Sequence, residues 1–247
     1  MNKYNDFEKI IHQNSDNADV LQAYKMSLSE YSKEDIMRIL AEDNDEIKLM
    51  PIINLKSIDN IDELKLVLSH LTGKDGRIRE AISYILSENP SCMNLIQNEA
   101  LNQIVVQGLM DINPNVARNI ISLIEKNEAY KKIITPFIIK KTENVLESLS
   151  EYIKSSLPYK ENKEKSQKNH AKNKLTFNLY WLLSAIAILD VNNIENIEKI
   201  LTKTSDFLDY TIREKTALIL SKMNNPPKKL LQKLQQDENI YVKNQLL

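Results

Sequence analysis

The stretch Asp75-Gly76-Arg77-Ile78-Arg79-Glu80-Ala81 decides the fold, because its pattern returns at Asp209-Tyr210-Thr211-Ile212-Arg213-Glu214. In both places an Asp stands four residues before an Arg, and an aliphatic residue directly precedes that Arg. Asp is favoured as the capping residue of a helix, and apolar residues at helical spacing follow both stretches. Similar starts with Asn in place of Asp run from Asn44 to Lys48, Asn113 to Arg118 and Asn239 to Lys243. Such self-similarity is typical of a stacked repeat protein.

The repeating unit is expected to be a pair of helices. The basic residues that end the five starts are 31, 39, 95 and 30 residues apart along the chain, and Leu179-Tyr180 fits the same frame 33 residues before Arg213. The unit is therefore about 30–40 residues long, within the range of known helical repeats. The 247 residues include only 3 Gly, and the tight turns of a β-rich fold usually need Gly. We therefore predict an all-α fold, a right-handed α-solenoid of stacked antiparallel helix hairpins that covers residues 1–247 as a single unit.

Two segments are expected to differ from the repeat. Residues 1–42 are expected to form N-terminal capping helices. Residues 157–174 are rich in Lys and almost free of apolar side chains, so we predict an insertion or a disordered loop there. The apolar helical spacing resumes at Leu175–Leu189, which contains the only Trp of the chain, Trp181.

The Asp–Arg pairs predict a polar ladder between repeats. An Arg in the first turn of a helix lies unfavourably near the positive end of the helix dipole. Its position is better explained if the guanidinium reaches an acceptor elsewhere, such as the capping Asp of an adjacent repeat. The predicted members of this ladder are Asp75, Arg79, Asn113, Arg118, Asp209 and Arg213. We expect the ladder to fix the register between neighbouring hairpins.

At the stretches that begin at Asp75, Asn113 and Asp209, the chain resembles the HEAT-repeat superfamily, particularly the short bacterial HEAT-like repeats also found in phycobilin lyases. The clear matches cover residues 42–126 and 175–247, whereas residues 129–174 depart from the pattern. The resemblance implies an armadillo-like helical architecture and a bacterial source. It also leaves a bilin-lyase-like or a DNA-glycosylase-like activity open, although no catalytic residue follows from it.

The sequence contains no recognisable catalytic or metal-binding constellation. His12, His70 and His170 are far apart, and none belongs to a pair with metal-ligand spacing. The single Cys92 cannot form an intramolecular disulfide, which fits a reducing compartment. The N-terminus lacks the features of a secretion signal, and the longest apolar stretch is too short to span a bilayer. We expect a cytoplasmic protein that is not an enzyme, with no cofactor, metal or membrane partner.

The charge is unevenly distributed although the net charge is only −1. Residues 1–100 carry 11 Lys and Arg against 18 Asp and Glu, whereas residues 101–247 carry 22 against 16. The asymmetry indicates either compositional drift on solvated helix faces or an electrostatically selective surface. Only five of the 33 basic residues are Arg, which disfavours phosphate recognition because the Arg fork fits phosphate better than Lys.

The candidate partner-binding residues are aromatic and basic. Trp181, with Tyr180, is expected either to pack in the core or to anchor a partner. The lysines of the C-terminal half are either solvated or contact an acidic partner or nucleic acid, the candidates being Lys131, Lys132, Lys140 and Lys141. The leading hypothesis is a scaffold or adaptor that binds a protein partner along one face of the stack. The alternative is a HEAT-like nucleic-acid-binding protein with a basic groove in its C-terminal half.

Overall fold

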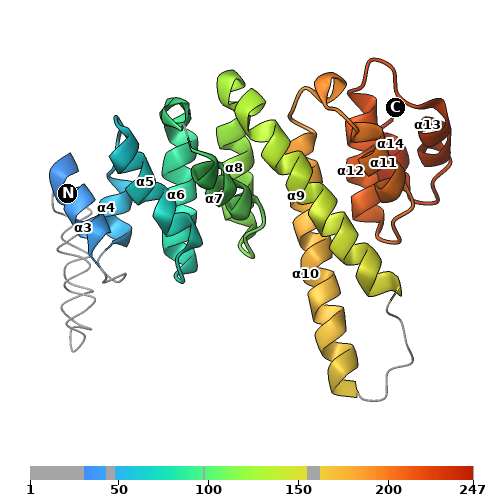
Figure 1. The fold of residues 1–247 in the computed structure, drawn as a ribbon, viewed down its shortest axis with the longest axis horizontal. Coiled ribbons are helices and arrows are strands. Elements are labelled where there is room, and N and C mark those ends of the chain that lie inside the picture. The colour runs from blue at the N-terminus through green and yellow to red at the C-terminus, as the bar shows by residue number, and fades with distance from the viewer. Residues whose placement is uncertain (1–30, 43–47, 97, 155–161, 247) are drawn as a thin grey trace, which may run out of the picture.

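The computed structural model describes residues 31–42, 48–96, 98–154 and 162–246, and every regular element in these ranges is an α-helix or a 3₁₀ turn (Figure 1). The α-helices are α3 (Lys33–Ala41), α4 (Leu49–Ile53), α5 (Ile61–Ser69), α6 (Gly76–Glu88), α7 (Glu99–Leu109), α8 (Pro114–Glu125), α9 (Glu128–Lys154), α10 (Asn162–Ile186), α11 (Ile197–Ser205), α12 (Tyr210–Ser221), α13 (Lys228–Gln235) and α14 (Ile240–Asn244). The 3₁₀ turns are η2 (His70–Thr72), η3 (Pro90–Leu95) and η4 (Val191–Asn193).

The helices form two layers that run along the whole described chain. In one layer α3, α5, α7, α9, α11 and α13 contact one another in that order, and in the other α4, α6, α8, α10, α12 and α14 do so. Consecutive helices such as α7 and α8, or α11 and α12, pack as pairs. Figure 1 shows the stack extending from α3 at one end to α13 and α14 at the other. The predicted α-solenoid is confirmed. We call the layer of even-numbered helices the second-helix layer.

The recurring sequence starts are helix N-termini. The side chains of Asp75, Asn113, Asp209 and Asn239 each accept a hydrogen bond from the backbone N–H two residues later. These bonds satisfy one of the amides that the first turn of a helix leaves unpaired. Asn113 is followed by Pro114, whose fixed φ suits the first helical position. The start at Asn44 lies outside the described residues.

The core is a continuous row of aliphatic side chains between the two layers. In α6, Ile78, Ile82 and Leu86 recur every four residues and are 3%, 0% and 0% exposed. Gly108 allows α7 to approach α8 closely, since a Cβ at this position would lie 3.2 Å from Cγ1 of Ile120. The helical stripes read from the sequence therefore face inward and hold the layers together.

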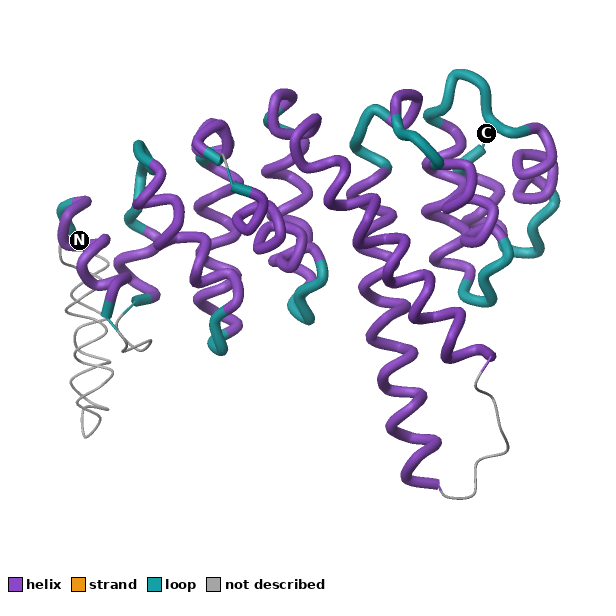
Figure 2. Tube along the Cα trace, viewed as in Figure 1, coloured by secondary structure: helices purple, strands orange, loops and turns teal. Residues whose placement is uncertain are grey.

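The α9–α10 hairpin departs from the short repeat. α9 has 27 residues and α10 has 25, whereas α6, the longest of the remaining described helices, has 13. The two long helices lie side by side and extend well beyond their neighbours (Figure 2). α9 also continues through Pro136, where the sequence suggests a break or a kink. The departure expected over residues 129–174 therefore takes the form of a longer hairpin.

The Lys-rich segment is not a disordered loop from Asn162 onward, because residues 162–174 belong to α10. Residues 157–161 lie outside the described residues. The expectation of a loop rested on the lack of apolar side chains. However, Lys, Glu, Gln and Ala favour helix, and residues 162–174 contain neither Gly nor Pro. Contact between α10 and α9 then supplies the packing that an isolated helix lacks.

The N-terminal part of the described chain begins with α3, which contacts α4 and α5. Lys33 of α3 forms ion pairs with Asp59 at 2.5 Å and with Glu63 at 2.7 Å. Residues 1–30 lie outside the described residues, so capping by residues 1–42 stays a prediction. In the described ranges, no helix is both long and apolar enough to cross a membrane.

Candidate functional site

Arg79, in the first turn of α6, joins two neighbouring repeats. Its Nε and Nη2 donate to the two carboxylate oxygens of Asp111 at 2.5 and 3.1 Å. Its Nη1 donates to the backbone carbonyls of Gly73 and Lys74 at 2.8 and 2.9 Å. Asp111 lies in the loop before α8 and also accepts from the backbone N–H of Asn113 at 2.8 Å. We call this set of bonds an Arg–Asp clamp.

Arg213, in the first turn of α12, makes a second Arg–Asp clamp with the same bonds. Its Nε and Nη2 donate to Asp237 at 2.6 and 3.0 Å. Its Nη1 donates to the backbone carbonyls of Phe207 and Leu208 at 2.8 and 2.9 Å. Asp237 in turn accepts from the backbone N–H of Asn239 at 2.9 Å. The same arrangement therefore occurs towards both ends of the stack.

Both clamps are largely shielded from solvent. The side chains of Arg79 and Asp111 are 13% and 7% exposed, and those of Arg213 and Asp237 are 11% and 8% exposed. The hydrogen bonds to Asp111 and Asp237 raise the pKa of the two guanidinium groups, and the bond from Arg213 lowers the pKa of Asp237. Removal of either partner would leave the shielded charge of the other without compensation.

The clamps differ from the predicted ladder in their acceptor. An Arg does reach the adjacent repeat, but it bonds an Asp two residues before the capping Asn and not the cap itself. The predicted members Asp75 and Asp209 cap their own helices. Hydrogen bonds from Arg77 lower the pKa of the Asp75 carboxyl from its ordinary value to about 2.

Arg118, also expected in the ladder, makes other contacts. It stands five residues after its cap Asn113, one more than in the clamps, and one residue rotates a helix position by about 100°. The residue at the clamp position is Ala117, which is 0% exposed. Arg118 instead donates to Oδ1 of Asn115 at 3.0 Å, and its guanidinium lies 5.8 Å from the centre of the Trp181 ring.

A row of aromatic and basic side chains crosses α6, α8, α10 and α12. Tyr84 on α6 is 52% exposed and lines the same shallow pocket as Arg118 on α8. Arg118 lies over Trp181 on α10, and Nζ of Lys215 on α12 lies 5.1 Å from the ring centre of Tyr180. The rings of Tyr180 and Trp181 meet edge to face at 5.2 Å. We call Tyr84, Arg118, Tyr180 and Lys215 the aromatic–basic stripe.

A second aromatic pair lies further along the same layer. Tyr210 of α12 and Tyr241 of α14 are 40% and 60% exposed. Their rings stack with centres 6.2 Å apart. Exposed aromatic side chains therefore also occur on α12 and α14 of the second-helix layer.

The two aromatic candidates on α10 occupy different environments. Trp181 is only 7% exposed and packs against the rings of Phe177 and Tyr180, which agrees with the core interpretation. Its indole Nε1 is buried and finds no hydrogen-bond partner in the described part of the chain. Tyr180 is half-buried, so its ring is accessible at the surface. Trp181 therefore lies just beneath the stripe, with Arg118 over it.

The four candidate lysines of α9 do not form one patch. Lys131 pairs with Glu128 at 2.5 Å, and Lys132 is exposed. Lys140 and Lys141 lie roughly two and a half turns later on the helix. They line a groove of about 560 Å³ between α7 and α9. The second pair therefore contributes to a concave surface.

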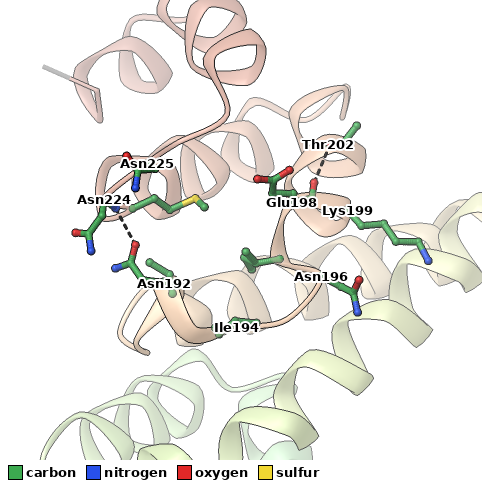
Figure 3. Close-up of a pocket in the computed structure, with 11 residues that line it drawn as sticks. Asn192, Ile194, Asn196, Glu198, Lys199, Thr202, Asn224 and Asn225 are labelled. Atoms are coloured by element: carbon green, nitrogen blue, oxygen red, sulfur yellow. Dashed lines mark hydrogen bonds between the residues drawn. The ribbon is translucent and has the colours of Figure 1, made fainter.

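An open groove of about 840 Å³ lies near the C-terminal end of the stack. Figure 3 shows its amide-rich lining, which includes Asn192, Asn196, Asn224 and Asn225. Asn192 accepts from the backbone N–H of Asn224 at 2.7 Å, and Asn196 has a φ of 61°, a conformation that Asn tolerates. The ionisable lining residues are one Glu and one Lys. The polar lining of this groove therefore reflects the loops that form it, and it points to no particular ligand or reaction.

The other reactive side chains have structural explanations. Among the described residues, no group of His, Cys, Asp and Glu is arranged to hold a metal ion. Burial raises the pKa of the Cys92 thiol to about 12, so the reactive thiolate is scarce at neutral pH. Nε2 of His70 lies 2.9 Å from the carbonyl oxygen of Leu40, whereas His170 is exposed. His12 lies outside the described residues.

Sequence reasoning misses a second tie between repeats. Lys126, at the C-cap of α8, donates to the carbonyl of Ser87 at 2.9 Å. Lys222, at the C-cap of α12, donates to the carbonyl of Ala187 at 2.6 Å. The sequence feature that could predict these bonds is the Lys at the end of each helix, since basic side chains at helix C-termini commonly bond unpaired carbonyls.

Comparison with known proteins returns no matching family profile and no matching curated protein. Among solved structures, the chain is similar to an engineered protein of the Northeast Structural Genomics Consortium, with 13% identity, a TM-score of 0.43, and coverage of 86% of this chain and 92% of that one. It is also similar to a designed armadillo repeat protein, with 12% identity, a TM-score of 0.46, and coverage of 85% and 95%. Neither likeness bears on function, and the helical-repeat fold rests on the helix contacts themselves.

Proposed function

We propose that this protein is a non-enzymatic scaffold or adaptor that binds a protein partner along the aromatic–basic stripe. The observation that carries the proposal is the continuity of the stripe over four neighbouring helices. Aromatic and Arg side chains dominate the binding free energy of protein interfaces. Neighbouring helices lie about 8–10 Å apart, so the stripe offers contacts spread along an extended partner segment.

The charge of the stripe favours a partner segment with acidic side chains. Arg118 is exposed and covers Trp181, and Lys215 is half-buried over Tyr180. An acidic side chain that pairs with Arg118 draws the guanidinium away from the indole. Trp181 then becomes available as a central apolar contact, and its unpaired N–H gains access to an acceptor. The proposed partner therefore combines carboxylates with apolar side chains.

We also propose that the repeats are of the HEAT-like subtype and that the protein is cytoplasmic, and each proposal has its own observation. Each Arg–Asp clamp connects the first turn of one second-layer helix with the loop before the next, as a repeated register device requires. The free Cys92 fits a compartment that keeps thiols reduced.

Site-specific photo-crosslinking in cells tests the protein-partner proposal. A photoreactive phenylalanine replaces Tyr84 or Lys215 in the full chain, and the matched control replaces Lys132, which is exposed on α9 in the other layer. We expect one protein to be captured from positions 84 and 215 but not from 132. The charge reversal Arg118→Glu should reduce its capture at least tenfold, about 1.4 kcal/mol. Equal capture from all three positions, or capture from none, rejects the proposal.

Nucleic acid is the second candidate partner, because Lys140 and Lys141 line a groove. The net charge of −1 and the five Arg among 33 basic residues weigh against it. Titration with DNA and RNA at low and high salt separates the two candidates, since phosphate contacts make affinity strongly salt-dependent. Absence of binding at low ionic strength eliminates nucleic acid.

A further inference from the structure

A groove between α7, α9 and α10 differs in character from the stripe. It has a volume of about 690 Å³. It adjoins the 560 Å³ groove between α7 and α9, with which it shares Gln107, Met110, Lys141 and Asn144. Sites for small molecules in proteins typically occupy about 300–1,000 Å³. The size therefore suits a small molecule.

The groove carries positive charge. Lys141 of α9 and Lys174 of α10 line it, together with His170. None of these three groups forms an ion pair with any described residue. The one carboxylate in the lining is Asp111, which the Arg79 clamp already neutralises. An anion entering the groove therefore meets two uncommitted ammonium groups and no free negative charge.

The rest of the lining suits a ligand that has an apolar part and one hydrogen-bond donor. Met110 and Val145 are buried, and Leu175 and Phe177 are half-buried, so their side chains supply an apolar wall. Oδ1 of Asn178 is buried without a hydrogen-bond partner in the described residues. A buried acceptor without a donor is unfavourable, and a ligand N–H or O–H would satisfy it.

We propose that this groove binds a small organic anion with an apolar body, namely an aromatic or medium-chain acid. The acid group lies between Lys141 and Lys174, the apolar body packs on Val145 and Phe177, and a donor of the ligand faces Asn178. Charge and apolar surface act together, which is the usual composition of a small-molecule site. This binding is independent of the protein partner assigned to the stripe.

A pair of fluorescent probes tests the proposal on the purified full chain. Anilinonaphthalene sulfonate carries an acid group, an aromatic body and an N–H donor, and phenylnaphthylamine is the same body without the acid. The single Trp181 reports on occupancy by energy transfer, because its ring lies 6.1 Å from that of Phe177 in the groove wall. We expect the sulfonate to bind at one site, at least tenfold more tightly than the uncharged probe.

Variants inside and outside the groove show whether the probe binds at this site. The double variant Lys141→Gln/Lys174→Gln should weaken the sulfonate by about tenfold or more, as expected for losing hydrogen bonds to a charged group, and leave the uncharged probe unchanged. Lys131→Gln/Lys132→Gln, outside the groove, removes the same number of charges and is the control. Decanoate or octyl phosphate should displace the probe, and their relative potency tells a carboxylate from a phosphate ligand.

Three outcomes would overturn the proposal. The first is equal affinity for the two probes, and the second is unchanged sulfonate affinity in Lys141→Gln/Lys174→Gln. The third is failure of both decanoate and octyl phosphate to compete. An unchanged thermal unfolding curve in the same variant separates loss of the site from loss of the fold. The stripe variant Arg118→Glu should leave probe binding intact, so the groove and the stripe succeed or fail separately.

Discussion

At the scale of single residues, the Arg–Asp clamps place a cation where helix electrostatics alone disfavour it. Arg79 and Arg213 lie in the first turn of α6 and α12, near the positive end of each helix dipole. A bidentate carboxylate and two backbone carbonyls offset that penalty. The guanidinium thereby also supplies donors to two loop carbonyls, so one side chain connects two loops and a helix.

Loss of one clamp partner should destabilise the fold strongly. Arg79→Met leaves the shielded Asp111 carboxylate unpaired, and we expect a loss of about 2–4 kcal/mol in the free energy of unfolding. Urea denaturation followed by circular dichroism measures it. Arg118→Met is the matched control, since Arg118 is exposed and its change should cost less than about 1 kcal/mol. Similar losses in the two variants would contradict a structural role for the clamp.

Stability should fall in acid in part because of Asp75 and Asp237, two of the four described carboxyl groups whose pKa is lowered. The pKa of Asp75 falls from 3.8 to about 2 through bonds from Arg77, and that of Asp237 falls through bonds from Arg213. A carboxyl whose pKa is lower in the folded state stabilises the fold above its unfolded pKa. That contribution is lost as pH falls through the folded pKa. We therefore expect stability to drop between about pH 4 and pH 2.

Urea denaturation across this range, with the variant Asp75→Asn/Asp237→Asn as comparison, checks the acid prediction. The variant should be less stable than the native chain at neutral pH and should show a weaker dependence on acid. A pH dependence equal to that of the native chain would exclude these two groups as its source.

The residue-level predictions succeed where the signal is local. A cap acts on an amide two residues away, so Asp75, Asn113 and Asp209 can be read from the sequence. The clamp acceptors Asp111 and Asp237 come from a different repeat, 32 and 24 residues from their Arg. The usable signal is an Asp two residues before a capping Asn, which both share. Arg118 does not form a clamp because it stands five residues after its cap, whereas each clamp Arg stands four residues after its own.

At the scale of helices, α7 and α8 depend on the absence of a side chain at Gly108. A Cβ there would lie 3.2 Å from Ile120, and a branched side chain would extend further into the same space. We expect Gly108→Val to cost about 1–3 kcal/mol of unfolding free energy, as overpacked cores do. Thermal and urea denaturation measure the loss. Gln107→Val, at an exposed position on the same helix, is the control. A loss no larger than that of Gln107→Val would contradict close packing at Gly108.

The first part of α10 illustrates what a composition argument misses. Few apolar residues predict a loop when each segment is considered alone, but residues 162–174 form a helix that continues into the apolar half of α10. A helix that is already nucleated extends readily through residues of good propensity. The hairpin with α9 is a tertiary contact, and the sequence of one segment does not contain it.

At the scale of the whole molecule, the solenoid was predictable because the same local signal recurs along the chain. A helix-start pattern that recurs at a regular spacing predicts a stack of repeats even when no contact between the repeats is known. The stripe and the groove were not predictable to the same degree. Their residues come from three or four different helices, and only stacking brings them together. The sequence identifies Lys140 and Lys141 as basic candidates, but their position in a groove depends on the packing of α7 against α9.

The stack should not open uniformly. The clamps connect α6 with the loop before α8 and α12 with the loop before α14, whereas α8 carries Ala117 at the clamp position. In repeat proteins each unit is stabilised mainly by its neighbours, so a weak junction divides the molecule. We expect native-state hydrogen exchange to show two protected regions, α6–α8 and α12–α14, with different opening free energies. A single opening free energy across all amides would contradict this.

The missing clamp at Ala117 has a mechanical consequence. Because α8 carries Ala117 in place of a clamp Arg, we expect the stack to bend most readily between α8 and α10. A partner that binds along the stripe contacts helices on both sides of this junction, so its binding should reduce the bending of the stack.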